Sequence, residues 1–193
     1  AALSLKHHST VAKEALNRGA DIIVTGDDYA DRNGPIMSPK NFQELFLPYI
    51  RTLTVTIHAS GGKYIKHTDG NIMPILDMLV DAGIDCIDPI DPIGGMEIDV
   101  VKKQYGHKVA VKGNVDCTYV LCSGSYQEVK REVLNCMLKA SPSGGHIISS
   151  SNSIHSGVRP DNYRAMLDVI RAYGDYPINT GRLETSISQI VAQ

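Results

Sequence analysis

The sequence predicts an α/β fold of the (β/α)8 barrel type, with about five strand–helix units present. Short apolar stretches that suit buried strands alternate with stretches of helical spacing, which indicates parallel strands joined by helical crossovers. Each predicted strand ends in polar residues, as expected where loops converge on one mouth of a barrel. The chain has neither a GxGxxG motif after its first strand nor a P-loop, which argues against an open nucleotide-binding sheet.

The strands are read from short apolar runs that stop at polar or glycine-rich tips. The second of them follows the pair Gly61-Gly62 and ends in the tip His67–Gly70, where His67 and Asp69 leave the same face of an extended chain. The predicted strands, tips included, cover residues 20–25, 63–70, 85–88, 108–113 and 146–150.

The helices are read from apolar residues at helical spacing. Ser38 is a natural N-cap with Pro39 at the first helical position, and Pro48 is expected to break the helix that follows. The predicted helices cover residues 5–18, 39–53, 72–82 and 99–105, with two more that begin near 125 and after 162. Residues 175–193 are predicted to be a loosely patterned tail.

Composition bounds the class of protein. The 193 residues are 42% hydrophobic and 21% charged with a net charge of −2, which suggests neither a nucleic-acid partner nor a membrane surface. No apolar run reaches the roughly 18–20 residues of a membrane span, and the first residues lack a secretory pattern. The four cysteines form no close metal-type pair, so we expect reduced thiols in a cytoplasmic protein.

A series of short motifs runs through nearly the whole chain, and their order and spacing resemble the uroporphyrinogen decarboxylase superfamily. The motifs are Asp27-Asp28-Tyr29, Gly34–Pro39, Leu47-Pro48-Tyr49, His67–Asn71, Gly83-Ile84-Asp85, Lys112–Asp116, Gly144–Ile148 and Arg159–Asn162. The resemblance implies a (β/α)8 barrel. The superfamily contains the decarboxylases of haem synthesis and cobamide-dependent methyltransferases, which carry zinc and activate a thiol or a related acceptor.

The resemblance also implies that residues 1–193 are the C-terminal part of a single barrel domain. Family members are longer by roughly three strand–helix units, consistent with the strand count. We therefore expect either a truncated chain or a second chain that completes the barrel. Because a partial barrel exposes sheet edges and an apolar face, a homo-oligomer or a completing partner is expected.

The resemblance points to a metal site at His67 and Asp69. The zinc methyltransferases have a His-x-Cys pair where this chain has His67-Thr68-Asp69, and a second cysteine near the position of Asn152. Oxygen groups replace both thiolates here, so the site would bind zinc or a harder divalent ion, or no ion. The alternative is that Asp69 caps the following helix and His67 hydrogen-bonds to it.

Polar residues at the other strand tips complete the candidate site. Tip carboxylates can act as general acids or bases or bind a cationic substrate, although Asp before Pro is also ordinary turn chemistry. Lys112 would be a charge inside the barrel that needs a partner such as Asp88, or it forms a structural ion pair. We assign catalytic roles to Asp28, His67, Asp69, Asp88 and Lys112, and substrate-binding roles to Asp27, Asp91, Asn114, Asp116 and Asn152.

Three functions remain open. The first is methyl transfer to a small acceptor from a corrinoid carried by a partner protein, with the tip residues holding the acceptor in its deprotonated form. The second is a porphyrinogen decarboxylase, which needs no cofactor but needs basic groups for the substrate carboxylates, and Lys112 is the main one at these tips. The third is a non-catalytic barrel fragment that serves as an assembly module.

Overall fold

The computed structural model describes residues 2–192, and within them the chain divides into two compact units. The first comprises residues up to 88 together with 93–96 and 107–110, and the second comprises 89–92, 97–106 and 111 onward. Across residues 2–192, no helix combines the length and the apolar character that a membrane crossing requires.

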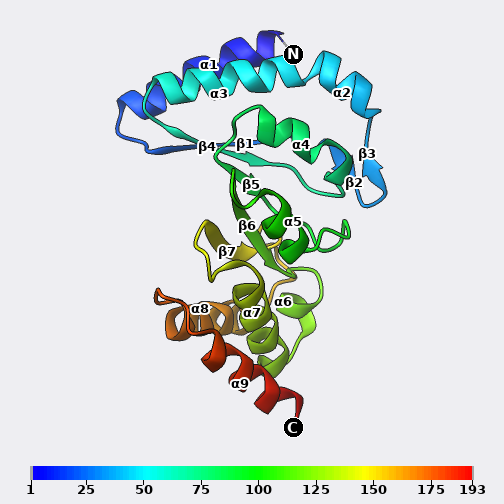
Figure 1. Ribbon diagram of the computed structural model, residues 1–193, viewed down its shortest axis with the longest axis vertical. Coiled ribbons are helices and arrows are strands. Elements are labelled where there is room, and N and C mark those ends of the chain that lie inside the picture. Colours follow the sequence, from blue (N-terminus) through cyan, green and yellow to red (C-terminus); the bar gives the residue numbers. More distant parts are fainter. Residues whose placement is uncertain (1, 193) are drawn as a thin grey trace. The chain divides into compact units, whose positions relative to one another are not determined.

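The first unit alternates helices with parallel strands. Its elements are α1 (Ala2–Asn17), β1 (Ile22–Gly26), β2 (Ala30–Asp31), β3 (Gly34–Pro35), α2 (Pro39–Leu45), α3 (Leu47–Ala59), β4 (Lys63–His67), α4 (Met73–Asp81) and β5 (Cys86–Asp88). The strand order is β1-β4-β5, with both pairings parallel, and α1 and α3 lie side by side over the β1–β4 pair (Figure 1). β2 and β3 form a small antiparallel hairpin in a segment for which the sequence predicted no strand.

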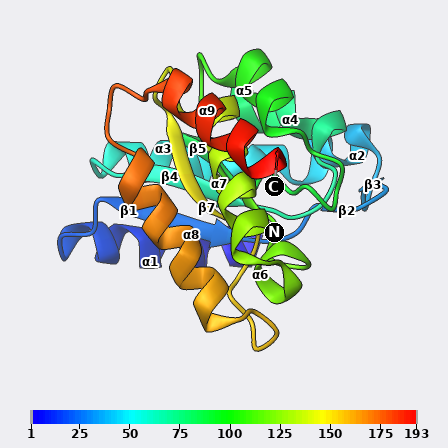
Figure 2. The ribbon, with the colours of Figure 1, turned by 90° about the horizontal axis from the view of Figure 1, so that it is seen from below.

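The second unit continues the alternation. Its elements are α5 (Ile98–Tyr105), β6 (Ala110–Val115, whose first residue belongs to the first unit), α6 (Val120–Ser123), α7 (Tyr126–Ala140), β7 (His146–Ser150), α8 (Pro160–Tyr173) and α9 (Thr180–Val191). β6 and β7 pair in parallel, and α8 and α9 both pack on α7 (Figure 2). The predicted strands and their parallel pairing within each unit are therefore confirmed.

Local sequence signals explain where the helices begin. Ser38 accepts a hydrogen bond from the Asn41 amide at the start of α2, as predicted, and the break near Pro48 is found as the boundary between α2 and α3. In α7, Ser125 and Glu128 form a complete capping box, in which each side chain accepts from the other residue's backbone amide.

Each unit has an aliphatic core, as expected for a chain with no Trp and two Phe. In the first unit α4 buries one face, formed by Ile75, Leu76, Leu79 and Val80. In the second unit the core gathers residues of α7, α8 and the loops after β6 and β7, among them Val133, Leu134 and Met166. This packing holds the strands whose ends carry the polar residues.

Helix α9 corrects the prediction of a loosely patterned tail at residues 175–193. Asn179 caps it by accepting from the Arg182 amide at 3.0 Å, Leu183 and Ser186 are buried, and Tyr173 hydrogen-bonds Ser186 at 3.1 Å. The helix forms because Leu183 joins the core of the second unit, where Ile187 and Ile190 pack against it.

Candidate functional site

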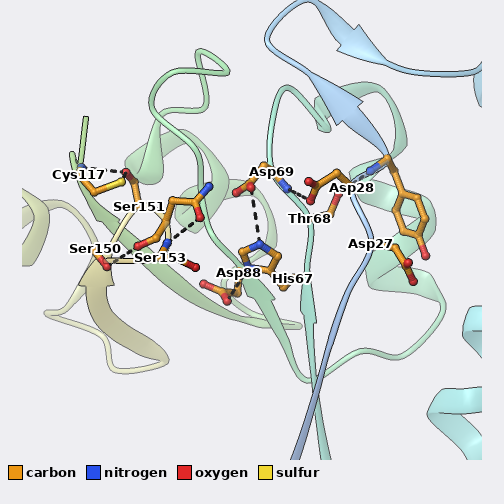
Figure 3. Close-up of polar contacts among 12 residues, drawn as sticks. Asp27, Asp28, His67, Thr68, Asp69, Asp88, Cys117, Ser150, Ser151 and Ser153 are labelled. Carbon is orange, nitrogen blue, oxygen red and sulfur yellow. Dashed lines mark hydrogen bonds and ion pairs between the residues drawn. The ribbon is translucent and has the colours of Figure 1, made fainter. Parts of the chain in front are cut away.

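The tips of β1 and β4 bring three metal-ligating side chains together in the first unit. Gly26, the last residue of β1, stands in register with His67, the last residue of β4. Asp28 follows β1 and Asp69 follows β4, and the Asp69 amide donates to Asp28 Oδ1 at 3.1 Å. One ligand atom each from Asp28, His67 and Asp69 lies within 4.8 Å of the others (Figure 3).

Backbone contacts fix the position of these tips. The Thr68 amide donates to the Asp88 carbonyl at 2.7 Å, and Thr68 Oγ1 accepts from the Tyr29 amide at 2.9 Å. Thr68 is fully buried, so both bonds are shielded from water. Gly70 has φ +83°, and a Cβ there would meet the Asp31 carbonyl oxygen at 2.6 Å, so this glycine lets the hairpin approach the tip of β4.

Asp88, the last residue of β5, orients the imidazole of His67. His67 Nδ1 lies 3.0 Å from Asp88 Oδ2, and His67 Nε2 lies 3.7 Å from Asp69 Oδ2. The hydrogen bond with the Asp88 side chain raises the pKa of His67 above its ordinary value, while partial burial opposes this and the charges of Asp88, Asp69 and Asp28 add to it. Nδ1–H therefore donates to Asp88, and Nε2 is directed toward Asp69.

The three donors fit a divalent ion. One imidazole nitrogen and two carboxylates suit zinc, manganese or iron, and the carboxylate behind the imidazole is the usual outer partner of a metal-bound histidine. The interpretation of Asp69 as the cap of the next helix is wrong, because α4 has Ile72 at its N-cap and Asn71 Oδ1 accepts from the Met73 amide at 3.2 Å.

Lys66 is a buried charge that the sequence analysis missed. Its side chain is inaccessible to solvent, its Nζ donates to the Asp27 carbonyl at 3.2 Å, and it lies 4.5 Å from the centre of the Tyr29 ring. Burial lowers the pKa of Lys66 to about 8, although the carboxylates of Asp27 and Asp28 raise it. The available signal was a lysine within a strand whose neighbours, Tyr64 and Ile65, are both apolar or aromatic.

Two of the residues predicted to bind substrate, Asn114 and Asp116, belong to the second unit. Asn114 is buried within β6, and its Oδ1 lies 3.5 Å from Cys136 Sγ. Asp116 lies beyond the end of β6, so it does not share a strand face with Lys112 and Asn114. It accepts from the Thr118 amide at 2.7 Å and so forms a turn.

The loop after β7 is held by its own side chains. Ser150 Oγ donates to the Asn152 carbonyl at 2.7 Å, and Asn152 Oδ1 accepts from the Ser153 amide at 2.6 Å (Figure 3). The substrate roles assigned to Asp27, Asp91, Asn114, Asp116 and Asn152, and the catalytic role of Lys112, stay predictions.

Comparison with known proteins places the chain in a family. The sequence profile described as "Uroporphyrinogen decarboxylase (URO-D)" matches residues 3–173. The uroporphyrinogen decarboxylase of Pseudoalteromonas atlantica is 23% identical over 166 residues, which cover 82% of this chain and 43% of that protein. That of Pelodictyon phaeoclathratiforme is 25% identical over 166 residues, covering 81% of this chain and 43% of that protein.

A solved structure agrees in fold. A methyltransferase from Methanosarcina mazei matches with a TM-score of 0.75 and 18% identity, over 89% of this chain and 48% of that one. The chain thus spans less than half the length of the relatives it matches, and its fold is α/β of the partial (β/α)-barrel type, as predicted. With the family profile matched along residues 3–173, the chain belongs to the uroporphyrinogen decarboxylase (URO-D) family.

Proposed function

We propose that this chain is the metal-binding part of a methyltransferase of the URO-D family. The observation that carries the proposal is the cluster of Asp28, His67 and Asp69, whose ligand atoms lie within 4.8 Å of one another, with His67 oriented by Asp88. The fold likeness to a methyltransferase supports this choice within the family.

The three side chains would hold the ion through His67 Nε2 and the carboxylates of Asp28 and Asp69. A bound divalent ion supplies Lewis acidity, which lowers the pKa of an acceptor group that it contacts. Asp88 accepts a hydrogen bond from His67 Nδ1–H, so in the neutral ring Nε2 keeps its lone pair for the metal, and the bond limits rotation of the ring. This arrangement selects the tautomer that the site needs.

The donor set bears on the kind of acceptor. The two carboxylates of Asp28 and Asp69 are harder ligands than the two thiolates of the zinc methyltransferases that the sequence resembles. They therefore leave the bound ion a stronger Lewis acid. We therefore expect the chain to favour a methyl acceptor that binds the ion through oxygen or nitrogen, or a thiol whose pKa must be lowered strongly before it reacts. The methyl donor in this proposal is a corrinoid held by a separate protein.

A porphyrinogen decarboxylase is the second candidate, favoured by the curated relatives. Here the imidazolium of His67, stabilised by Asp88 and Asp69, would act as a general acid. When the bond to the carboxyl carbon breaks and carbon dioxide leaves, the electron pair stays on the substrate carbon. His67 Nε2–H would then supply the proton that completes the methyl group.

The first experiment is calorimetric titration of the purified chain with Zn²⁺, Mn²⁺ and Co²⁺ after treatment with EDTA. We expect one ion per chain, and a loss of affinity of at least about tenfold in His67→Ala and in Asp28→Asn. Asp81→Asn is the matched control, because Asp81 is an exposed carboxylate of the same unit that pairs with Lys108 at the surface. Equal binding by all four proteins would contradict the proposed metal site.

The second experiment separates the two reactions. The metal-loaded chain is incubated with methylcobalamin and either 2-mercaptoethanol or an amine, and the metal-free chain with uroporphyrinogen. Demethylation of the cobalamin that His67→Ala abolishes supports methyl transfer, whereas loss of carboxyl groups from the porphyrinogen supports the decarboxylase. Activity in neither assay, with no ion bound, would leave an assembly role as the remaining candidate.

A further inference from the structure

The first unit contains a cleft of about 320 Å³ that the proposed reaction does not use. It is lined by residues of α1, α3 and the β1–β4 pair, among them Thr25 and Tyr64, whose hydroxyls hydrogen-bond each other at 2.7 Å. Its walls are residues of α1, of the segment before α2, and of α3. The volume is enough for a small organic molecule.

The charged groups in this cleft are mostly acidic. Asp27 and Asp28 both line it, and His8 is the only basic side chain among its lining residues. Asp28 is turned toward Asp69, whereas Asp27 lies on the other side of the strand end (Figure 3). Asp27 is thus a carboxylate that the metal cluster does not include and that a ligand in the cleft can reach.

Aromatic and aliphatic side chains supply the rest of the lining. These side chains include Tyr29, Phe46, Tyr49, Ile50 and Leu53. The ring of Tyr29 packs edge-on against that of Phe46, with ring centroids 5.7 Å apart. Aromatic faces attract ammonium groups, and aliphatic walls favour an apolar body. One face of Tyr29 already carries the Lys66 ammonium, so Phe46 and Tyr49 offer the rings for a ligand.

The hydroxyls of the cleft add no negative charge of their own. Burial raises the pKa of Tyr64 to about 12 and raises that of Tyr29 further, so both are neutral donors and acceptors near neutral pH. An anionic ligand would face the two carboxylates of Asp27 and Asp28, and a purely apolar ligand would remove part of their surface from water without replacing the hydrogen bonds that water makes there. A cation with an apolar body satisfies both parts of the lining.

We propose that this cleft binds a small organic cation, an ammonium group on an apolar or aromatic body, with its charge on Asp27 and its body against Phe46 and Tyr49. The site is separate from the metal cluster except for Asp28. The proposal does not rest on the proposed methyl transfer and can hold if that reaction fails.

The test is calorimetric titration of the full chain in EDTA, so that the metal cluster holds no ion. The probes are benzyltrimethylammonium, benzyl alcohol and benzoate, which share a benzyl or phenyl body and differ in charge. We expect the cation to bind at least about tenfold more tightly than the other two. Because this comparison uses only the wild-type protein, it does not depend on the folding of a variant.

Two variants locate the site. Asp27→Asn should weaken binding of benzyltrimethylammonium about tenfold, and Tyr49→Ala should weaken it several-fold, with circular dichroism as the check on folding. Asp21→Asn, an exposed carboxylate just before β1, is the matched control and should leave binding unchanged. Benzoate binding as tightly as the cation, no binding of the cation, or an unchanged affinity in Asp27→Asn would each overturn the proposal.

Discussion

Replacement of Lys66 by methionine should stabilise the protein near neutral pH. Lys66 is inaccessible to solvent, and its pKa is lowered to about 8 from 10.5 because burial penalises the ammonium. A folded pKa below the unfolded pKa means that the folded state loses the proton first, so the penalty is complete below the folded pKa and vanishes above the unfolded one. Methionine fills a similar volume without a charge.

The size of the effect follows from the shift. One pKa unit corresponds to about 1.4 kcal/mol, so the lowering of the Lys66 pKa from 10.5 to about 8 means that the buried ammonium destabilises the folded state by about 3 kcal/mol at pH 7. This destabilisation falls to about 1.5 kcal/mol at pH 9.5. The hydrogen bond to the Asp27 carbonyl and the contact with the Tyr29 ring are lost in the variant, which offsets about 1–2 kcal/mol. We expect a net gain of about 1–2 kcal/mol at pH 7 that shrinks as the pH rises.

Urea unfolding of the wild type and Lys66→Met, followed by circular dichroism between about pH 6.5 and 9.5, measures this difference. The free energy of unfolding of the wild type should rise relative to that of the variant by about 2 kcal/mol across the range. Lys66→Gln, which keeps a hydrogen-bond donor, is a useful second variant. A difference that does not change with pH would refute the reasoning, because it would mean that Lys66 does not change its protonation preference on folding.

Three further predictions concern the supports of the site and fold. Gly70→Ala should destabilise the protein by more than about 2 kcal/mol, because Gly70 has φ +83° and a Cβ there would meet backbone atoms 2.6–2.7 Å away. Gly61→Ala, at φ +80° but with no atom close to the new Cβ, should cost about 1 kcal/mol. Equal losses of stability in urea unfolding would contradict this. Ser125→Ala removes the capping box of α7 and should cost about 1 kcal/mol by thermal unfolding, and an unchanged midpoint would show that the cap contributes nothing. Asp85 accepts hydrogen bonds from three donors; burial raises its pKa, but these hydrogen bonds outweigh burial and hold the pKa below its ordinary value. Asp85→Asn should therefore lower the free energy of unfolding by about 1–3 kcal/mol at neutral pH, and this loss should fade as acid protonates the wild-type carboxylate. A loss of stability that is independent of pH would contradict this.

The alternation of strands and helices could be predicted because its signals are local. Apolar runs that stop at His67 or Asp88 and helices that begin at Ser38 or Ser125 need no knowledge of the rest of the chain. Helix α9 was missed because its apolar positions are few, and its stability comes from Leu183 in the core of the second unit, which is tertiary packing.

The candidate site could be predicted only in part. The sequence predicted that His67 and Asp69 share the face of an extended strand, but β4 ends at His67 and Asp69 lies in the loop beyond it, where its side chain still comes close to that of His67. The nearness of Asp28 follows from the register of β1 with β4. The partner of His67 could not be read from the sequence, which offered Asp88 as a partner for Lys112 instead. Lys66 was missed because the sequence shows a charge but not how completely its strand is covered.

The position of a bound ion tests the central claim most directly. Crystals of the chain soaked with Mn²⁺ or Zn²⁺ and measured on either side of the metal absorption edge would give the anomalous scattering of the ion. We predict one strong anomalous peak within bonding distance of Asp28, His67 Nε2 and Asp69, with His67 Nδ1 still bonded to Asp88. A peak elsewhere, or none in crystals soaked well above the dissociation constant, would contradict the account.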